Sequence, residues 1–184
     1  MNIGRFSLRS AAIVVLAGAL SACQDSIHDL ARFGREVDVR TQLDSNPDLI
    51  RAKGNLDKTP LHEAAAGPSD EVVKLLLDRG ADIQAKDVTG LSPLHVAAIL
   101  ENKPAALELL RRGADIEAKD DFGDTPLHLA AIFDKRDMIK LLVEHGAKIE
   151  AANNKGQSPL QVARSGRKDE AVKTLRALGA ADSQ

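Results

Sequence analysis

The sequence predicts an all-α fold, a solenoid of stacked helix-turn-helix units with β-turn tips between them. The first observation behind this prediction is a four-residue motif that returns in steps of 33 residues, at 59–62, 92–95, 125–128 and 158–161. The second is a series of glycines with the same step, namely Gly80, Gly113, Gly146 and Gly179. The third is the composition, since 43% of the residues are apolar but only 2% are aromatic. We therefore expect small helices whose core consists of Leu, Val, Ile and Ala.

The first 22 residues have the pattern of a secretory signal peptide. Arg5 and Arg9 lie in a start without acidic residues, and an uninterrupted apolar run follows at 11–20. Such a run is too short to cross a bilayer core, which needs about 20 residues. The alternative is a buried N-terminal helix of the fold, but polar residues end the run abruptly at Asp25.

The segment 20–23, Leu-Ser-Ala-Cys, resembles the lipobox of bacterial lipoproteins. The resemblance implies cleavage after residue 22, lipidation of Cys23 and a lipidated tether at 23–27 that attaches the chain to a membrane. Cys23 is the only cysteine in the chain, and an unmodified thiol is the alternative. In enterobacterial lipoproteins an Asp directly after the lipidated cysteine favours the inner membrane, whereas here Gln24 intervenes before Asp25. By this analogy we expect the bacterial cell envelope, on the periplasmic face of the outer membrane.

Each 33-residue unit contains a short helix, a second helix and a turn. Proline at the first helical position, after a Ser or Thr cap, begins the first helix at Pro60, Pro93, Pro126 and Pro159. Paired alanines in this helix allow neighbouring helices to approach closely. The second helix has larger apolar residues at helical spacing, such as Leu76, Leu109, Leu142 and Leu175. Glycine in the left-handed conformation ends it, and segments such as 87–90 form β-turns.

These motifs resemble the ankyrin repeat over nearly the whole chain after residue 27. The resemblance implies an ankyrin-repeat domain at 28–184, with an N-terminal cap repeat at 28–57, full repeats at 58–90, 91–123 and 124–156, and a C-terminal cap repeat at 157–184. It also implies a protein partner held on a concave face. The chain departs from the family at the inter-helix turns, where glycine is replaced by Pro68, Glu101, Asp134 and Arg167, and at a β-turn, where Asp57 replaces glycine.

The three in-register histidines, His62, His95 and His128, invite a metal or catalytic interpretation. Stacked helices lie about 8–10 Å apart, whereas zinc requires its ligands at about 2.1 Å, so successive histidines cannot share an ion. The resemblance gives them a structural hydrogen-bonding role instead. We expect His28 and His145 on the surface. With no nucleophile elbow, phosphate-binding loop or metal motif, we expect no enzyme, no catalytic residue, no metal and no cofactor.

The net charge also bears on the partner. A formal charge of −2 and few aromatic residues argue against nucleic acid. We expect a monomer that binds a protein.

Positions at the β-turn tips and first helices are unusually apolar in the second and third full repeats. We therefore predict a protein-binding patch consisting of Val88, Leu91, Ile99, Leu100, Phe122, Ile132 and Phe133. The alternative is that part of it, Ile99 and Ile132 above all, fills the seam between repeats. Asp121, Asp124 and Asp134 flank the patch and suggest an acidic rim facing a basic partner.

The sequence thus predicts a lipid-anchored protein–protein interaction module of the bacterial cell envelope. Two sharper versions stay open at this point. One is a periplasmic inhibitor or immunity protein that neutralises a toxin or hydrolase. The other is a scaffold or chaperone for an envelope stress-defence enzyme.

Overall fold

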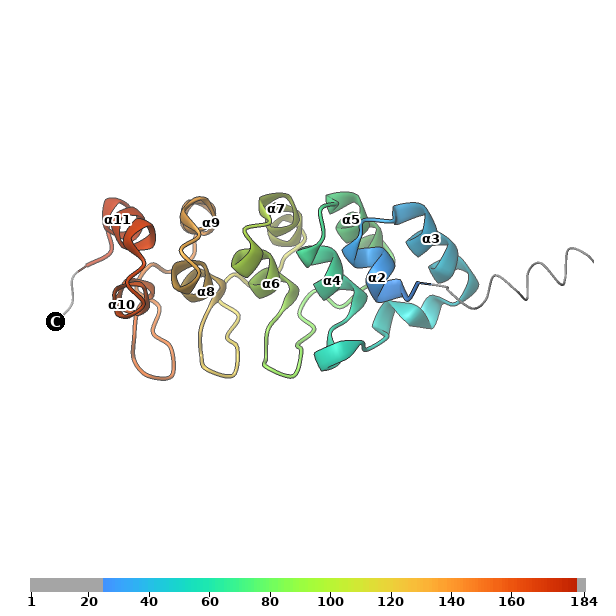
Figure 1. Cartoon of the computed structure of the whole chain (residues 1–184), viewed down its shortest axis with the longest axis horizontal. Coiled ribbons are helices and arrows are strands. Elements are labelled where there is room, and N and C mark those ends of the chain that lie inside the picture. The colour runs from blue at the N-terminus through green and yellow to red at the C-terminus, as the bar shows by residue number, and fades with distance from the viewer. Residues whose placement is uncertain (1–24, 182–184) are drawn as a thin grey trace, which may run out of the picture.

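The computed structural model describes residues 25–181, which form a solenoid of paired helices without a β-strand in that range (Figure 1). The predicted signal peptide, Cys23 and most of the predicted tether lie outside these residues. Inner helices are α2 (Ile27–Arg32), α4 (Pro60–Ala66), α6 (Pro93–Leu100), α8 (Pro126–Ile132) and α10 (Pro159–Ser165). Outer helices are α3 (Glu36–Ser45), α5 (Asp70–Asp78), α7 (Lys103–Arg111), α9 (Arg136–Glu144) and α11 (Asp169–Ala177). Two short 3-10 helices, Pro47–Arg51 and Asn55–Asp57, precede α4. The all-α solenoid prediction is confirmed.

The inner helices begin where the motif predicts. Proline stands in the first turn of α4, α6, α8 and α10, where its missing N–H leaves no hydrogen bond unmade. In α6, the Ser92 hydroxyl accepts from the backbone N–H of His95, and the His95 ring accepts from the backbone N–H of Ser92. This reciprocal capping box recurs in the other three helices, with Gln161 in place of histidine in α10.

Small and large apolar side chains divide the packing between the two helix rows. The paired alanines of the inner helices, such as Ala97 and Ala98, have no exposed surface, so that successive inner helices lie side by side. Leu76, Leu109 and Leu142 of the outer helices are likewise fully buried. Each such leucine contributes about 1.5–3 kcal/mol by leaving water. A single helix pair cannot bury these apolar faces on its own, so the repeats are stable only when they stack on one another.

Three inter-helix turns have a left-handed residue that is not glycine. Glu101, Asp134 and Arg167 have φ values of 57°, 58° and 55°. Two of these side chains contact the next unit, because Glu101 Oε1 accepts from the N–H of Asp137 at 3.2 Å and Asp134 Oδ1 accepts from the N–H of Ala171 at 2.7 Å. These N–H groups lie in the first turns of α9 and α11, whose own cap residues make no side-chain cap bond. Two residues that replace glycine, Glu101 and Asp134, therefore cap the outer helix of the next repeat.

One surface prediction is wrong. His28 is half-buried, and its Nε2 lies 3.2 Å from the carbonyl oxygen of Ala52 and 3.0 Å from that of Lys58. In the 33-residue register it takes the place of Leu61, so the N-terminal cap repeat places a hydrogen-bonding ring where the full repeats bury leucine. His145 is exposed as expected.

Candidate protein-binding site

The β-turn loops at 87–90, 120–123 and 153–156, here called the fingers, project from the inner-helix row on the side away from the outer helices (Figure 1). Each finger is held by the side-chain oxygen of its first residue. Asp120 Oδ1 accepts from the N–H groups of Phe122 and Asp124, both at 2.9 Å, and Asp87 and Asn153 repeat this arrangement. The tip residues are therefore free to face outward while the backbone is fixed.

One main-chain hydrogen bond joins each finger to the preceding turn. The N–H of Val88 donates to the carbonyl of Leu56, that of Asp121 to Thr89, and that of Asn154 to Phe122, at 3.0–3.2 Å. Lysines Lys86 and Lys119 each add a bond to a carbonyl one repeat further on, both at 2.8 Å. These repeated contacts make the row of fingers a continuous surface.

The three histidines connect each inner helix to the next turn. His95 Nδ1 accepts from the Ser92 N–H at 3.1 Å, so that its protonated Nε2 donates to the carbonyl of Asp124 at 3.1 Å. His62 and His128 make the same pair of contacts. Burial lowers the pKa of all three rings, although the carbonyl hydrogen bond opposes this.

Both nitrogens of each ring are thus engaged, which matches the structural role that the resemblance implies. In the described part of the chain, no three His, Cys, Asp or Glu side chains gather as metal ligands. Residues 25–181 also contain no helix long and apolar enough to cross a membrane.

The seven residues of the predicted patch differ in exposure. Phe122 is 65% and Phe133 47% exposed, and Val88 and Leu100 are also exposed, whereas Leu91, Ile99 and Ile132 are half-buried. Ile99 and Ile132 are not among the described half-buried side chains that pack against the core. Both isoleucines keep part of their surface in solvent, and their role in binding a partner stays a prediction.

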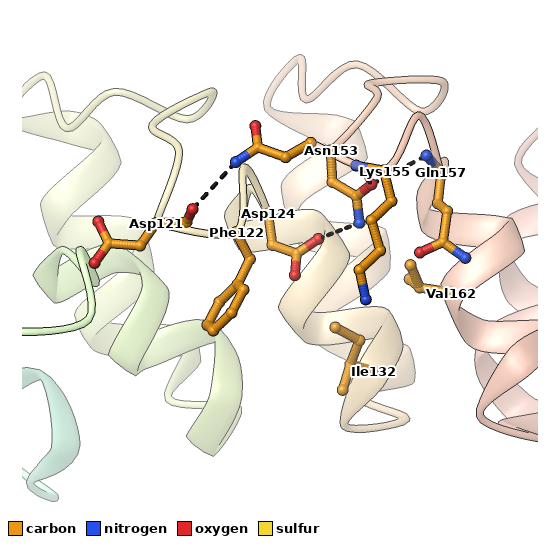
Figure 2. A pocket seen from close by; sticks show the side chains of 9 residues that line it. Asp121, Phe122, Asp124, Ile132, Asn153, Lys155, Gln157 and Val162 are labelled. Atoms are coloured by element: carbon orange, nitrogen blue, oxygen red, sulfur yellow. Dashed lines mark hydrogen bonds between the residues drawn. The ribbon is translucent and has the colours of Figure 1, made fainter.

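The structure brings two members of the patch together in one pocket, which has a volume of about 360 Å³ (Figure 2). Phe122 and Ile132 line it with Val162 of α10, so that three apolar side chains from one finger and two inner helices converge. The other lining residues are Asp121, Asp124, Asn153, Asn154, Lys155 and Gln157. The other five predicted residues are not part of this pocket.

Sequence reasoning left some residues out of the patch. Val162 and Lys155 line the pocket, and Val162 could have been found because it lies one repeat after Leu129 on an inner helix. Leu56 and Phe33 are 60% and 66% exposed in the N-terminal repeat. Leu56 lies two repeats before Phe122, at the same position of the repeat. The N-terminal cap repeat lacks the four-residue motif, so the sequence did not reveal this correspondence.

The acidic rim looks different in three dimensions. Asp124 is buried, and its Oδ1 accepts from Asn153 Nδ2 at 2.8 Å. Asp134 caps α11. The Asp121 carboxylate lies beside Gly90 of the preceding finger and points away from Phe122 in Figure 2. Asp121 and Asp124 thus both line the pocket, whereas Asp134 is not among its lining residues.

Comparisons with known proteins agree with the repeat geometry. A family model described as ankyrin repeats in three copies matches residues 27–120 and, again, 94–183. The E3 ubiquitin-protein ligase XBAT33 of Arabidopsis thaliana is 39% identical over 72 residues. That match covers 38% of this chain and 14% of the ligase, so the chain spans only a small part of its relative.

Proposed function

The chain belongs to the ankyrin-repeat family, whose members are typically non-enzymatic protein–protein interaction modules, and from this premise we propose that it holds a protein partner on its finger face. The finger face is the surface formed by the fingers and the adjoining inner helices, which the family resemblance makes the concave side. It is this surface that contains the pocket of Phe122, Ile132 and Val162.

The observation that supports this proposal most strongly is the exposure of Phe122. A phenylalanine 65% exposed at a β-turn tip contributes little to the fold, because its ring is mostly in water. The backbone beneath it is held rigidly by Asp120, so that the ring is presented without a large loss of conformational freedom on binding. Rigid aromatic side chains beside a pocket are typical of binding hot spots.

The test is affinity capture from bacterial envelope extract with the double variant Phe122→Ala, Phe133→Ala. We expect an unchanged circular dichroism spectrum and melting temperature but no capture of the partner recovered by the wild type. The matched control is Leu107→Ala, which removes an apolar side chain 43% exposed on outer helix α7 and should capture normally. Equal capture by the double variant would refute a binding role for these rings.

The same proposal includes attachment of the chain to the cell envelope through Cys23. It is supported by the resemblance of segment 20–23 to a lipobox and by the position of the single cysteine there. Two or more acyl chains suffice for stable membrane anchoring. Mass spectrometry of the mature N-terminus should find a diacylglyceryl group on Cys23, and membrane fractionation should release a Cys23→Ala variant. An intact N-terminus with a free thiol at residue 23 would reject the anchor.

A further inference from the structure

We infer that the N-terminal repeat contacts the lipid bilayer through two exposed apolar side chains, Phe33 and Val37, so that the solenoid stands on the membrane by this end. This inference rests on the proposed lipidation of Cys23 and adds to it the protein surface that the bilayer covers. Three observations support it, namely the short chain between Cys23 and the fold, the exposure of the two side chains, and the paired charges around them.

The chain has almost no slack between Cys23 and the first described helix. Only Gln24 separates Cys23 from Asp25, where the described residues begin, and two residues span at most about 7 Å. From Asp25 onward the backbone is fixed, because the Asp25 carbonyl accepts from Gln42 Nε2 of α3 at 3.0 Å and Ser26 caps α2. Acyl chains on Cys23 would therefore hold the start of α2 within about one helix diameter, roughly 10 Å, of the bilayer surface.

Two large apolar side chains face water at this end of the solenoid. Phe33, at the end of α2, is 66% exposed, and Val37, in the first turn of α3, is 73% exposed. No other large apolar side chain of residues 25–181 is as exposed as these two. Helices α2 and α3 lie at one end of the helix rows, and α10 and α11 lie at the other (Figure 1). No repeat of the described part of the chain therefore packs against their outer side.

The later repeats have different residues where the N-terminal repeat has Val37. This valine is the third residue after the left-handed residue of its inter-helix turn. Asp137 and Glu170 hold the same position in α9 and α11, and Pro104 holds it in α7, all exposed. Terminal repeats of a solenoid usually have a polar outer face. An apolar residue at this position of the N-terminal repeat therefore indicates an apolar neighbour rather than water.

The charged groups around Phe33 and Val37 are paired within the protein. Three ion pairs lie there, namely Arg32–Glu63, Arg35–Asp38 and Arg40–Glu36, at 3.2, 2.6 and 2.5 Å. Because each arginine has a carboxylate partner, this surface has no excess of negative charge that the headgroups of an anionic bilayer would repel. Arginine side chains can also lay their apolar stems along the interface while the guanidinium stays in water.

Contact at this end leaves the finger face free for a partner. Successive inner helices contact one another from α2 to α8, and packed helices lie about 8–10 Å apart. The finger of Phe122, which precedes α8, is thus about 24–30 Å along the solenoid from α2. Side chains at a membrane interface reach only about 5–10 Å into it, so the two rings, Phe33 and Phe122, should be in different surroundings.

The test measures tryptophan fluorescence, for which the chain is well suited because it contains no tryptophan. The variant Phe33→Trp, lipidated and reconstituted into vesicles of phosphatidylethanolamine and phosphatidylglycerol, should emit at shorter wavelength than in water. Its emission should be quenched by lipids brominated on the acyl chains near the headgroup and protected from acrylamide in the water. Val37→Trp should give the same result.

Two controls separate contact with the bilayer from mere proximity. Phe122→Trp makes the same substitution at a ring 65% exposed, and its emission should be open to acrylamide and unaffected by the brominated lipids. Phe33→Trp combined with Cys23→Ala should emit as in water when mixed with the same vesicles, because two apolar side chains alone do not hold a protein on a membrane. Unchanged circular dichroism spectra will show that all variants are folded.

The outcomes separate this inference from the proposed anchor. If mass spectrometry finds the lipid on Cys23 but acrylamide quenches Phe33→Trp as strongly as its Cys23→Ala counterpart, the contact is overturned and the anchor stands. Quenching of Phe122→Trp by the brominated lipids would overturn the end-on placement. A free thiol at residue 23 would overturn both the anchor and the contact.

Discussion

The three buried histidines should make the stability of the fold fall as the pH drops below about 6.5, the ordinary pKa of the ring. In the folded chain, His95 Nδ1 faces the N–H of Ser92, so that a proton added there would meet another proton. Burial disfavours the charged ring as well, and the pKa of His62, His95 and His128 is accordingly lowered. The unfolded chain therefore takes up protons at a higher pH than the folded one.

The sign and the size follow from this difference. Because the folded pKa lies below the unfolded value, the free energy of unfolding is largest above pH 6.5 and decreases as the pH falls below it. Each proton taken up on unfolding changes that free energy by about 1.4 kcal/mol per pH unit. Three histidines give a limiting slope of about 4 kcal/mol per pH unit, which is a large part of the 5–15 kcal/mol typical of a whole domain.

The assay is urea unfolding followed by circular dichroism, at pH values from 8 down to 5. A matched variant exists in the chain itself, since Gln161 replaces histidine in the last capping box and accepts from the Ser158 N–H at 2.8 Å. His95→Gln should therefore keep the helix cap and reduce the slope to about two thirds, because one of three titrating groups is lost. A stability that is constant between pH 7 and 5 would refute the reasoning.

Three further predictions concern the stack and can be checked by the same unfolding measurements. Leu109→Asp places a charge in a closed interface and should cost at least about 3 kcal/mol, so an unchanged melting temperature would contradict the stacked packing. Asp134→Ala should cost about 1 kcal/mol, because α11 loses its cap while the left-handed strain remains. Asp134→Asn should be nearly neutral, since its amide oxygen can still accept. Gly123→Ala should destabilise the fold more than Gly156→Ala, although both glycines have positive φ. The Cβ added at residue 123 would lie 2.6 Å from the backbone of the next finger, whereas the Cβ added at residue 156 would meet open space.

Much of the local structure was determined by the sequence alone. Pro93 after Ser92 specifies a helix start by removing an N–H that would have no partner. Gly113 specifies a helix end, since its φ of 89° is strained for other residues. Such signals act within a few residues, and their recurrence every 33 residues predicts the stack because a single unit cannot bury its own apolar face.

Contacts between repeats were decided only in the tertiary structure. Asp134 appeared to be part of an acidic rim, but its carboxylate caps a helix 37 residues later. Ile132, Lys155 and Val162 form one pocket because two fingers and two inner helices meet there, and no local pattern indicates which way a lysine will point. His28 is half-buried because the turn at 52–58 folds back over it. Capping and turn preferences are short-range, whereas the direction and pairing of a side chain depend on neighbours that are distant in sequence and meet only when the repeats stack.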